Sequence, residues 1–282
     1  GGVDTTGTQT YGDAITLGAD ATLIGSTINT QSTLAGGGNA LTITGAADID
    51  GAFSGITNLS VSGTSNIGAN VTTTGTQTYV GAVTLSGGDR TLTGSTINTQ
   101  STLAGGGNAL AIAGAADIDG AYTGITNLSV SGTSNIGANV TTTGTQTYSG
   151  AVTVSAASTL STTNSNVTLG DSLSLAENLS VNTGAGAGDI LVAGAIDGVK
   201  ALSLSAGTGA ITLSGAVGQT TRLGTITLNS SGTTTLTQAV KAAGLTTNSG
   251  GTLLINGGGV DTTGTQTYGD AITLGADATL IG

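Results

Sequence analysis

One short acidic motif holds the residues best suited to bind a metal ion. The tetrapeptide Asp-Ile-Asp-Gly occurs twice, with its acids at Asp48, Asp50, Asp117 and Asp119. Carboxylate oxygens are good Ca²⁺ ligands, but an EF-hand loop adds a third acid and a terminal Glu, and neither copy has them. The four acids are therefore calcium candidates, weighed against a solvated turn with both carboxylates on one face of a strand.

Two further patterns suggest ligands of other kinds. The run from Gly184 to Val192 is loosely similar to a calcium-binding nonapeptide, although it occurs once and lacks two of the glycines. The heptapeptide TTGTQTY and the run Thr233–Thr235 offer threonines that could order water in an ice-binding array. The alternative is that threonine is simply a favoured outward residue on a strand.

The sequence offers little for catalysis, nucleic-acid binding or membrane insertion. It has no His or Cys and a single Glu, Glu177, and its four bases are far apart: Arg90, Lys200, Arg222 and Lys241. Hydrolysis needs paired carboxylates or an acid beside a base, and nucleic acid needs clustered cations. No apolar run reaches the length of roughly 18 residues that a membrane helix needs. We expect no enzyme activity, no catalytic residue and no cofactor, and no nucleic-acid partner or membrane insertion.

The chain is built from internal repeats. TTGTQTY begins at Thr5, Thr73, Thr142 and Thr262, and residues 25–79 recur at 94–148 with four differences. Residues 1–25 recur letter for letter at 258–282. We expect a single continuous array over residues 1–282 that is an internal piece of a longer repetitive protein.

The elements that must position these residues are short strands. Aliphatic residues alternate with Ser or Thr, as in Ile15/Leu17, Leu173/Leu175 and Ile211/Leu213, which predicts strands with one buried face. Glycine runs at 36–38 and 257–259 supply the positive φ angles that corners need. Charged residues are only 7% and aromatic residues 2% of the chain, so a thin core is expected.

Alternating strands with this repetition predict an all-β parallel β-helix, a β-solenoid. Coils of about 19–24 residues bury their apolar face only by stacking. The offset between the two long copies then holds three coils, and identical residues stack into ladders. At a spacing of about 4.8 Å, the period from Gly1 to Gly257 spans about 12 coils and roughly 58 Å.

Asparagine and the aromatic residues recur at fixed positions in the repeats. The predicted inward, turn-bonding asparagines are Asn29, Asn58, Asn66, Asn70, Asn98, Asn127, Asn135 and Asn139. The tyrosines of the heptapeptide, Tyr11, Tyr79, Tyr148 and Tyr268, are expected to line up on one side, either exposed for contacts or packed at a corner. Phe53 and Tyr122 occupy equivalent positions.

Seven sites match the acceptor pattern for N-glycosylation, and some are expected to point inward where no glycan fits. They begin at Asn58, Asn70, Asn127, Asn139, Asn166, Asn178 and Asn229.

Two stretches resemble the repeat regions of large filamentous-haemagglutinin-like bacterial surface proteins: Thr5 to Leu23 (TTGTQTYGDAITLGADATL) and Gly215 to Leu223 (GAVGQTTRL). The resemblance in repeat style extends over essentially the whole chain. It implies a right-handed parallel β-helix, secretion by the two-partner or autotransporter route, and a location outside the cell or on its surface.

Two functional hypotheses follow. The chain is the rigid stalk of a cell-surface adhesin, or it is a filament whose repeats associate with neighbouring repeats or identical chains. Calcium-binding, ice-binding and ligand-binding adhesin repeats are the alternatives, with cell-surface or matrix ligands as further partners. The net charge of −11 opposes lateral clumping of rods, so bundling is expected near pH 4.

Overall fold

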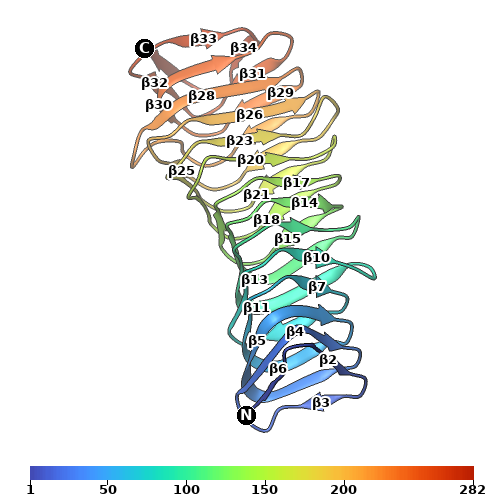
Figure 1. Ribbon diagram of the computed structural model, residues 1–282. Coiled ribbons are helices and arrows are strands. Elements are labelled where there is room, and N and C mark those ends of the chain that lie inside the picture. Colours follow the sequence, from blue (N-terminus) through green and yellow to red (C-terminus); the bar gives the residue numbers. More distant parts are fainter. The chain divides into compact units, whose positions relative to one another are not determined.

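The computed structural model describes residues 1–282, and all of its regular secondary structure is β-strand. Its 35 parallel strands form a β-solenoid of about 14 turns, without a helix (Figure 1). The predicted all-β solenoid is confirmed. Strands pair in parallel with strands one coil away, as Ser65 of β7 pairs with Val83 and Leu204 of β26 with Leu228.

The coil length varies along the chain. Facing residues on neighbouring coils are 18 residues apart at Asp48 and Asn66, and 24 residues apart at Ser205 and Asn229. The coils therefore match the predicted length closely, with the shortest lying just below the predicted range.

The chain divides into two compact units, Gly1–Gly132 and Thr133–Gly282. The predicted continuity over residues 1–282 stays a prediction. The strands of the first unit are β1 (Gly2–Asp4), β2 (Thr8–Tyr11), β3 (Ile15–Thr16), β4 (Ala21–Thr30), β5 (Leu34–Ile49), β6 (Phe53–Val61), β7 (Ser65–Ile67), β8 (Val71–Thr73), β9 (Thr76–Tyr79), β10 (Val83–Leu85), β11 (Arg90–Thr99), β12 (Leu103–Ala104), β13 (Leu110–Ile118), β14 (Tyr122–Ile125) and β15 (Leu128–Val130).

The strands of the second unit have at most 8 residues, whereas β5 in the first unit has 16. They are β16 (Ser134–Ile136), β17 (Val140–Thr142), β18 (Gln146–Tyr148), β19 (Val152–Val154), β20 (Ser158–Ser161), β21 (Val167–Leu169), β22 (Leu173–Leu175), β23 (Leu179–Asn182), β24 (Ile190–Val192), β25 (Ile196–Asp197), β26 (Leu202–Gly207), β27 (Ile211–Leu213), β28 (Leu223–Ser230), β29 (Thr233–Leu236), β30 (Val240–Thr247), β31 (Thr252–Ile255), β32 (Gly258–Thr262), β33 (Gln266–Tyr268), β34 (Ala271–Leu274) and β35 (Ala278–Ile281). Three columns of paired strands, beginning at Ser134, Val140 and Gln146, form its three faces.

The core of each unit follows from the period of two. In β22, Leu173 and Leu175 are buried and Ser174 between them is exposed, as the alternation predicts. Aliphatic residues of successive coils stack inside, as Leu173 does on Val152 and Ile196. This column buries apolar side chains that a single coil would leave in water, so stacking supplies the hydrophobic stabilisation.

Glycines at the predicted corner adopt the left-handed backbone. Gly37 has φ 60° and Gly38 has φ 83° at the bend within β5. A side chain is rarely tolerated at such angles. The predicted role of the glycine run is confirmed.

The relation between repeat length and coil length is not the predicted one. The column that begins at Gln9 continues through Ile28, Ala47, Ser65 and Val83. Gln77 occupies the same position in its repeat as Gln9 does in the first. It lies in sequence between Ser65 and Val83, which are the third and fourth residues after Gln9 in this column. The prediction of three coils per long repeat is wrong, because coils in this unit shorten to the 18 residues seen between Asp48 and Asn66.

Equivalent residues of successive repeats consequently do not stack on one another. Gln77 lies in another column, between Leu59 and Ile97, and thus on a different face from Gln9. Tyr11 stacks on Thr30, whereas Tyr79 stacks between Val61 and Thr99. The expectation that the heptapeptide tyrosines line up on one side is wrong for this pair.

The predicted inward asparagines face outward. Asn66 stands between the buried residues Ser65 and Ile67, so the alternation turns its own side chain away from the core. Asn58, Asn70, Asn127 and Asn139 are exposed, and Asn29, Asn98 and Asn135 are half-buried on the outer side of their strands. The prediction failed because it placed amides inside to bond the corner backbone, whereas they do so from outside.

Candidate functional site

The first calcium candidate belongs to a ladder of amides on the outer surface. Asp48, in β5, lies between Asn29 of β4 and Asn66 of β7, which are its register partners on the coils before and after. Asn29 Nδ2 donates to Asp48 Oδ2 at 3.3 Å, and Asn66 Nδ2 donates to Asp48 Oδ1 at 2.8 Å. Both carboxylate oxygens are thus engaged by amides, and exposed Asp50 lies just beyond the end of β5.

The second copy repeats the arrangement on another face. Asn98 Nδ2 donates to Asp117 Oδ2 at 2.7 Å, and these residues stack above Thr78, not in the column of Asp48. Asp119 is exposed, and burial, followed by the charge of Asp117, raises its pKa above the ordinary value. No three His, Cys, Asp or Glu side chains gather in a group able to hold a metal. Calcium binding at these four acids stays a prediction.

The glycine-rich loop from Gly184 to Asp189 is held through its backbone by asparagine oxygens. Asn164 Oδ1 accepts the N–H of Gly186 at 2.6 Å, and Asn166 Oδ1 accepts that of Asp189 at 2.8 Å. Asp189 Oδ1 in turn accepts the N–H of Ala210 at 2.7 Å. Each of these side chains reaches the coil that follows its own.

The same contact recurs at many corners and forms a set of outward staples. In each staple an Asn or Asp oxygen accepts a backbone N–H of the following coil, which satisfies a donor that the strands leave unpaired. The pairs are Asp20–Ala40, Asn70–Thr91, Asp89–Ala109, Asn139–Thr159 and Asn178–Ala201, with oxygen–nitrogen distances of 2.8 to 3.0 Å. All seven asparagines of the glycosylation pattern are exposed, so the expectation that some point inward is wrong.

The heptapeptide TTGTQTY builds a buried polar cluster. Gln77 is fully buried, and its Nε2 donates to the carbonyl oxygens of Val71 at 3.1 Å and Thr93 at 2.8 Å. Its Oε1 accepts the hydroxyl of Tyr79 at 2.9 Å, and Thr73 Oγ1 lies 3.5 Å from its Nε2. The amide therefore links residues of two successive coils inside the core.

All four copies of the heptapeptide form these hydrogen bonds, with the glutamine buried in the first three copies and half-buried at Gln266. In each copy the Tyr hydroxyl donates to the Gln Oε1, at 2.7 Å for Tyr11, 3.1 Å for Tyr148 and 2.6 Å for Tyr268. Tyr79 and Tyr148 are fully buried, so they are packed and do not form an exposed row. The cluster was not predicted from the sequence, although the constant spacing of Thr, Gln and Tyr in every copy is a signal for it.

The equivalent aromatics Phe53 and Tyr122 are also fully buried. The Tyr122 hydroxyl lies 2.9 Å from that of Thr99. Burial raises the pKa of Tyr122 above its ordinary value, as it does for Tyr79. Both tyrosines are therefore held neutral, and their role is in packing.

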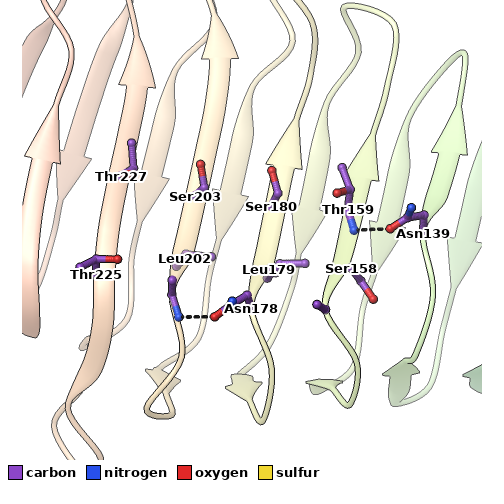
Figure 2. Close-up of a pocket in the computed structure, with 12 residues that line it drawn as sticks. Asn139, Ser158, Thr159, Asn178, Leu179, Ser180, Leu202, Ser203, Thr225 and Thr227 are labelled. Atoms are coloured by element: carbon purple, nitrogen blue, oxygen red, sulfur yellow. Dashed lines mark hydrogen bonds between the residues drawn. The ribbon is translucent and has the colours of Figure 1, made fainter.

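Hydroxyl groups line one outer face of the second unit. Thr159, Ser180, Ser203 and Thr227 stack in register on β20, β23, β26 and β28 and point outward in Figure 2. They border a shallow groove of about 460 Å³ whose corner residues include Asn139 and Asn178. These side chains can exchange hydrogen bonds with water or a polar ligand, but they carry neither a charge nor an acid–base group.

The threonines thought suitable for ice binding are divided between core and surface. At the second heptapeptide Thr73 is buried, while Thr74 and the preceding Thr72 are exposed, and in β29 Thr234 is buried between Thr233 and Thr235. The strand alternation separates neighbouring threonines in this way. Consecutive threonines therefore do not all face water.

Two ion pairs join bases to acids on other coils. Lys200 Nζ lies 2.9 Å from Glu177 Oε1, and Arg222 Nη2 lies 2.8 Å from Asp261 Oδ2. The hydrogen bond from Arg222 lowers the pKa of Asp261, and the charge of Lys241 contributes less. Arg90 instead donates to carbonyl oxygens, among them that of Asp89 at 2.8 Å.

No family model matches the chain, and no curated protein and no solved structure matches it either. The resemblance to filamentous-haemagglutinin-like repeats accordingly stays a prediction. The structure has no helix long and apolar enough to cross a membrane.

Proposed function

We propose that this chain is a structural repeat region of an extracellular bacterial fibre or adhesin stalk, without enzymatic activity. The observation that carries the proposal is how the repeated polar residues are used. Gln77 and its equivalents join coils from inside, and Asn178 and its equivalents join coils from outside. The repeats thus multiply contacts that hold one coil to the next.

The distribution of charge supports the same role. Fifteen acids and four bases give a net charge of −11. Like charge on neighbouring rods opposes side-by-side aggregation, which a chain of parallel strands would otherwise risk. A long extracellular structure has to stay dispersed along its sides while its coils continue along the axis.

The sequence repeat is not a whole number of coils long, and this mismatch also protects the chain, here from pairing of strands in the wrong register. Gln9 and Gln77 lie on different faces. If strands paired with partners one whole repeat away, the equivalent residues would therefore not meet the same neighbours. Repetitive strands are prone to register errors. A repeat that is out of phase with the coil favours one register and suits a structural array.

Protease accessibility tests the extracellular location. Intact cells of the source bacterium are treated with proteinase K, and the chain is detected by antibody before and after cell lysis. We expect loss of the chain from intact cells while a cytoplasmic marker survives. Survival of the chain in intact cells, with digestion only after lysis, would overturn the proposed location.

A further inference from the structure

The chain lacks the side chains that are most easily oxidised. It contains no Cys, Met, Trp or His, so the oxidation of thiols and thioethers has no site in it. Asparagine, which is thermolabile, instead recurs throughout the sequence and lies at many corners of the coils. The covalent reactivity of the chain therefore depends on how the structure holds each asparagine.

One asparagine, Asn256, is followed directly by a glycine. Asn256 and Gly257 form the only Asn-Gly pair of the sequence and lie between β31 and β32. In such a pair the backbone nitrogen of the glycine can approach the side-chain amide carbon closely, because glycine has no Cβ to keep the two atoms apart. Coils cover both sides of this corner, since Ile255 pairs with Leu236 and with Leu274. Its surroundings are therefore those of an interior coil.

Both groups that would react at this corner are free. Asn256 is exposed and its side-chain amide makes no hydrogen bond, whereas the amide of Asn178 holds the Ala201 N–H of the next coil. The nitrogen of Gly257 lies outside both strands and donates no hydrogen bond. The nitrogen and the amide carbon can therefore meet without breaking a contact of the fold.

Comparable positions have one of these groups engaged. In the pair Asp50 and Gly51, the glycine N–H donates to the carbonyl oxygen of Thr30 at 3.1 Å. At Asn248, the side-chain oxygen accepts the N–H of Ser230 at 3.0 Å, so the amide is held against the preceding coil. At either position a hydrogen bond must be released before the two atoms can meet.

We propose that Asn256 is a self-modifying site, which converts to aspartate and isoaspartate without an enzyme. The nitrogen of Gly257 bonds to Cγ of Asn256 and loses its proton, and Nδ2 leaves with that proton as ammonia, which closes a succinimide ring. Water then adds to a ring carbonyl and breaks its bond to nitrogen. Opening at Cγ gives aspartate, and opening at the backbone carbonyl gives isoaspartate.

Isoaspartate adds a methylene to the backbone at a corner that has no room for it. Gly257 packs so tightly on the preceding coil that a Cβ on it would lie 2.2 Å from the carbonyl oxygen of Thr237. β32 begins at the next residue, Gly258, and pairs with β30 through Val260 and Val240. The longer backbone therefore displaces the start of β32. We expect the amides of β32 to lose hydrogen-exchange protection in converted chains.

Peptide mapping of the aged 282-residue chain tests the site. The folded chain is incubated at mildly alkaline pH and digested with trypsin, which cleaves after Lys241, so that one peptide contains both Asn248 and Asn256. Fragmentation in the mass spectrometer locates each amide that has become an acid, and a purified isoaspartyl methyltransferase labels the isoaspartate. We expect Asn256 to be the first asparagine to convert and N256Q to abolish the label.

The variant D50N is the matched control, because it creates a second Asn-Gly pair that also follows an isoleucine, Ile49, but whose glycine N–H is bonded to Thr30. In the folded variant Asn256 should convert about twofold to tenfold faster than the new amide, since an ordinary hydrogen bond must be released at position 50. In urea the rates at the two pairs should become similar. Equal rates in the folded chain, or an Asn256 that stays intact when folded but converts in urea, would overturn the proposal.

Discussion

Replacing Gln77 by leucine should destabilise the coils that its amide joins. The change introduces an apolar side chain of similar size and leaves the Tyr79 hydroxyl and the Val71 carbonyl oxygen without their amide partner. The Thr93 carbonyl oxygen loses the amide as well but keeps the Thr73 hydroxyl as a donor at 3.4 Å. An unsatisfied buried polar group costs about 1–2 kcal/mol, so the Tyr79 hydroxyl and the Val71 carbonyl together cost about 2–4 kcal/mol. The gain from burying leucine offsets about 1 kcal/mol of this, which leaves an expected loss of about 1–3 kcal/mol.

Native-state hydrogen exchange is the suitable assay, because a solenoid opens locally and global unfolding does not report one coil. The amides of β9 and β11 should lose protection equivalent to that free energy. Q100L is the matched control, since Gln100 is exposed and a surface change is expected to cost less than about 0.5 kcal/mol.

A double-mutant cycle with Y79F isolates the Gln–Tyr contact. Y79F alone should cost about 1–2 kcal/mol, because it leaves the Gln77 Oε1 unpaired in the core. In Q77L/Y79F no hydroxyl is stranded, so the loss should fall short of the sum by about 1 kcal/mol. Equal protection in Q77L and Q100L would refute the claim that the buried cluster holds the coils together.

Three further outcomes are expected. Burial raises the pKa of Tyr79 and Tyr122, so folding holds both neutral; stability is retained below pH 10 and lost as pH rises above it, where the unfolded tyrosines ionise. Tyrosinate absorbance should therefore rise together with loss of the β-sheet circular dichroism signal, and ionisation of these tyrosines in a folded chain would contradict this. Near the isoelectric point of about 4.1 the rods should bundle, and light scattering that is unchanged between pH 7 and pH 4 would count against it. N178A should cost about 0.5–1.5 kcal/mol by removing the acceptor of the Ala201 N–H; N178D keeps an oxygen there, and equal hydrogen-exchange protection of the Ala201 amide in N178A and N178D would exclude the staple.

The strands and their stacking were predictable from the sequence because alternation is a local property. Leu173 and Leu175 flank Ser174, and this pattern alone determines which side chains are buried. The same rule places Asn66 outside, between Ser65 and Ile67. The prediction of inward asparagines failed because it weighed the hydrogen-bonding capacity of the amide above the alternation of its neighbours.

Two features could not be predicted from the local sequence pattern: the buried cluster around Gln77, and the face of the solenoid on which each repeat lies. Gln77 is polar, and its burial becomes favourable only where carbonyl oxygens from two coils and the Tyr79 hydroxyl converge on it. The position of that convergence depends on the lengths of all preceding corners. Small differences in coil length, summed over successive coils, move a repeat to another face.

The lengths of tandem chains with one, two and three copies of the unit from Gly1 to Gly257 test the structural account most directly. With 282 residues in about 14 turns, each coil takes about 20 residues. At about 4.8 Å per coil, every added unit should lengthen the particle by about 60 Å at constant width. Electron microscopy that shows this linear growth is the predicted result, and particles that thicken with each unit would contradict a stacked structural solenoid.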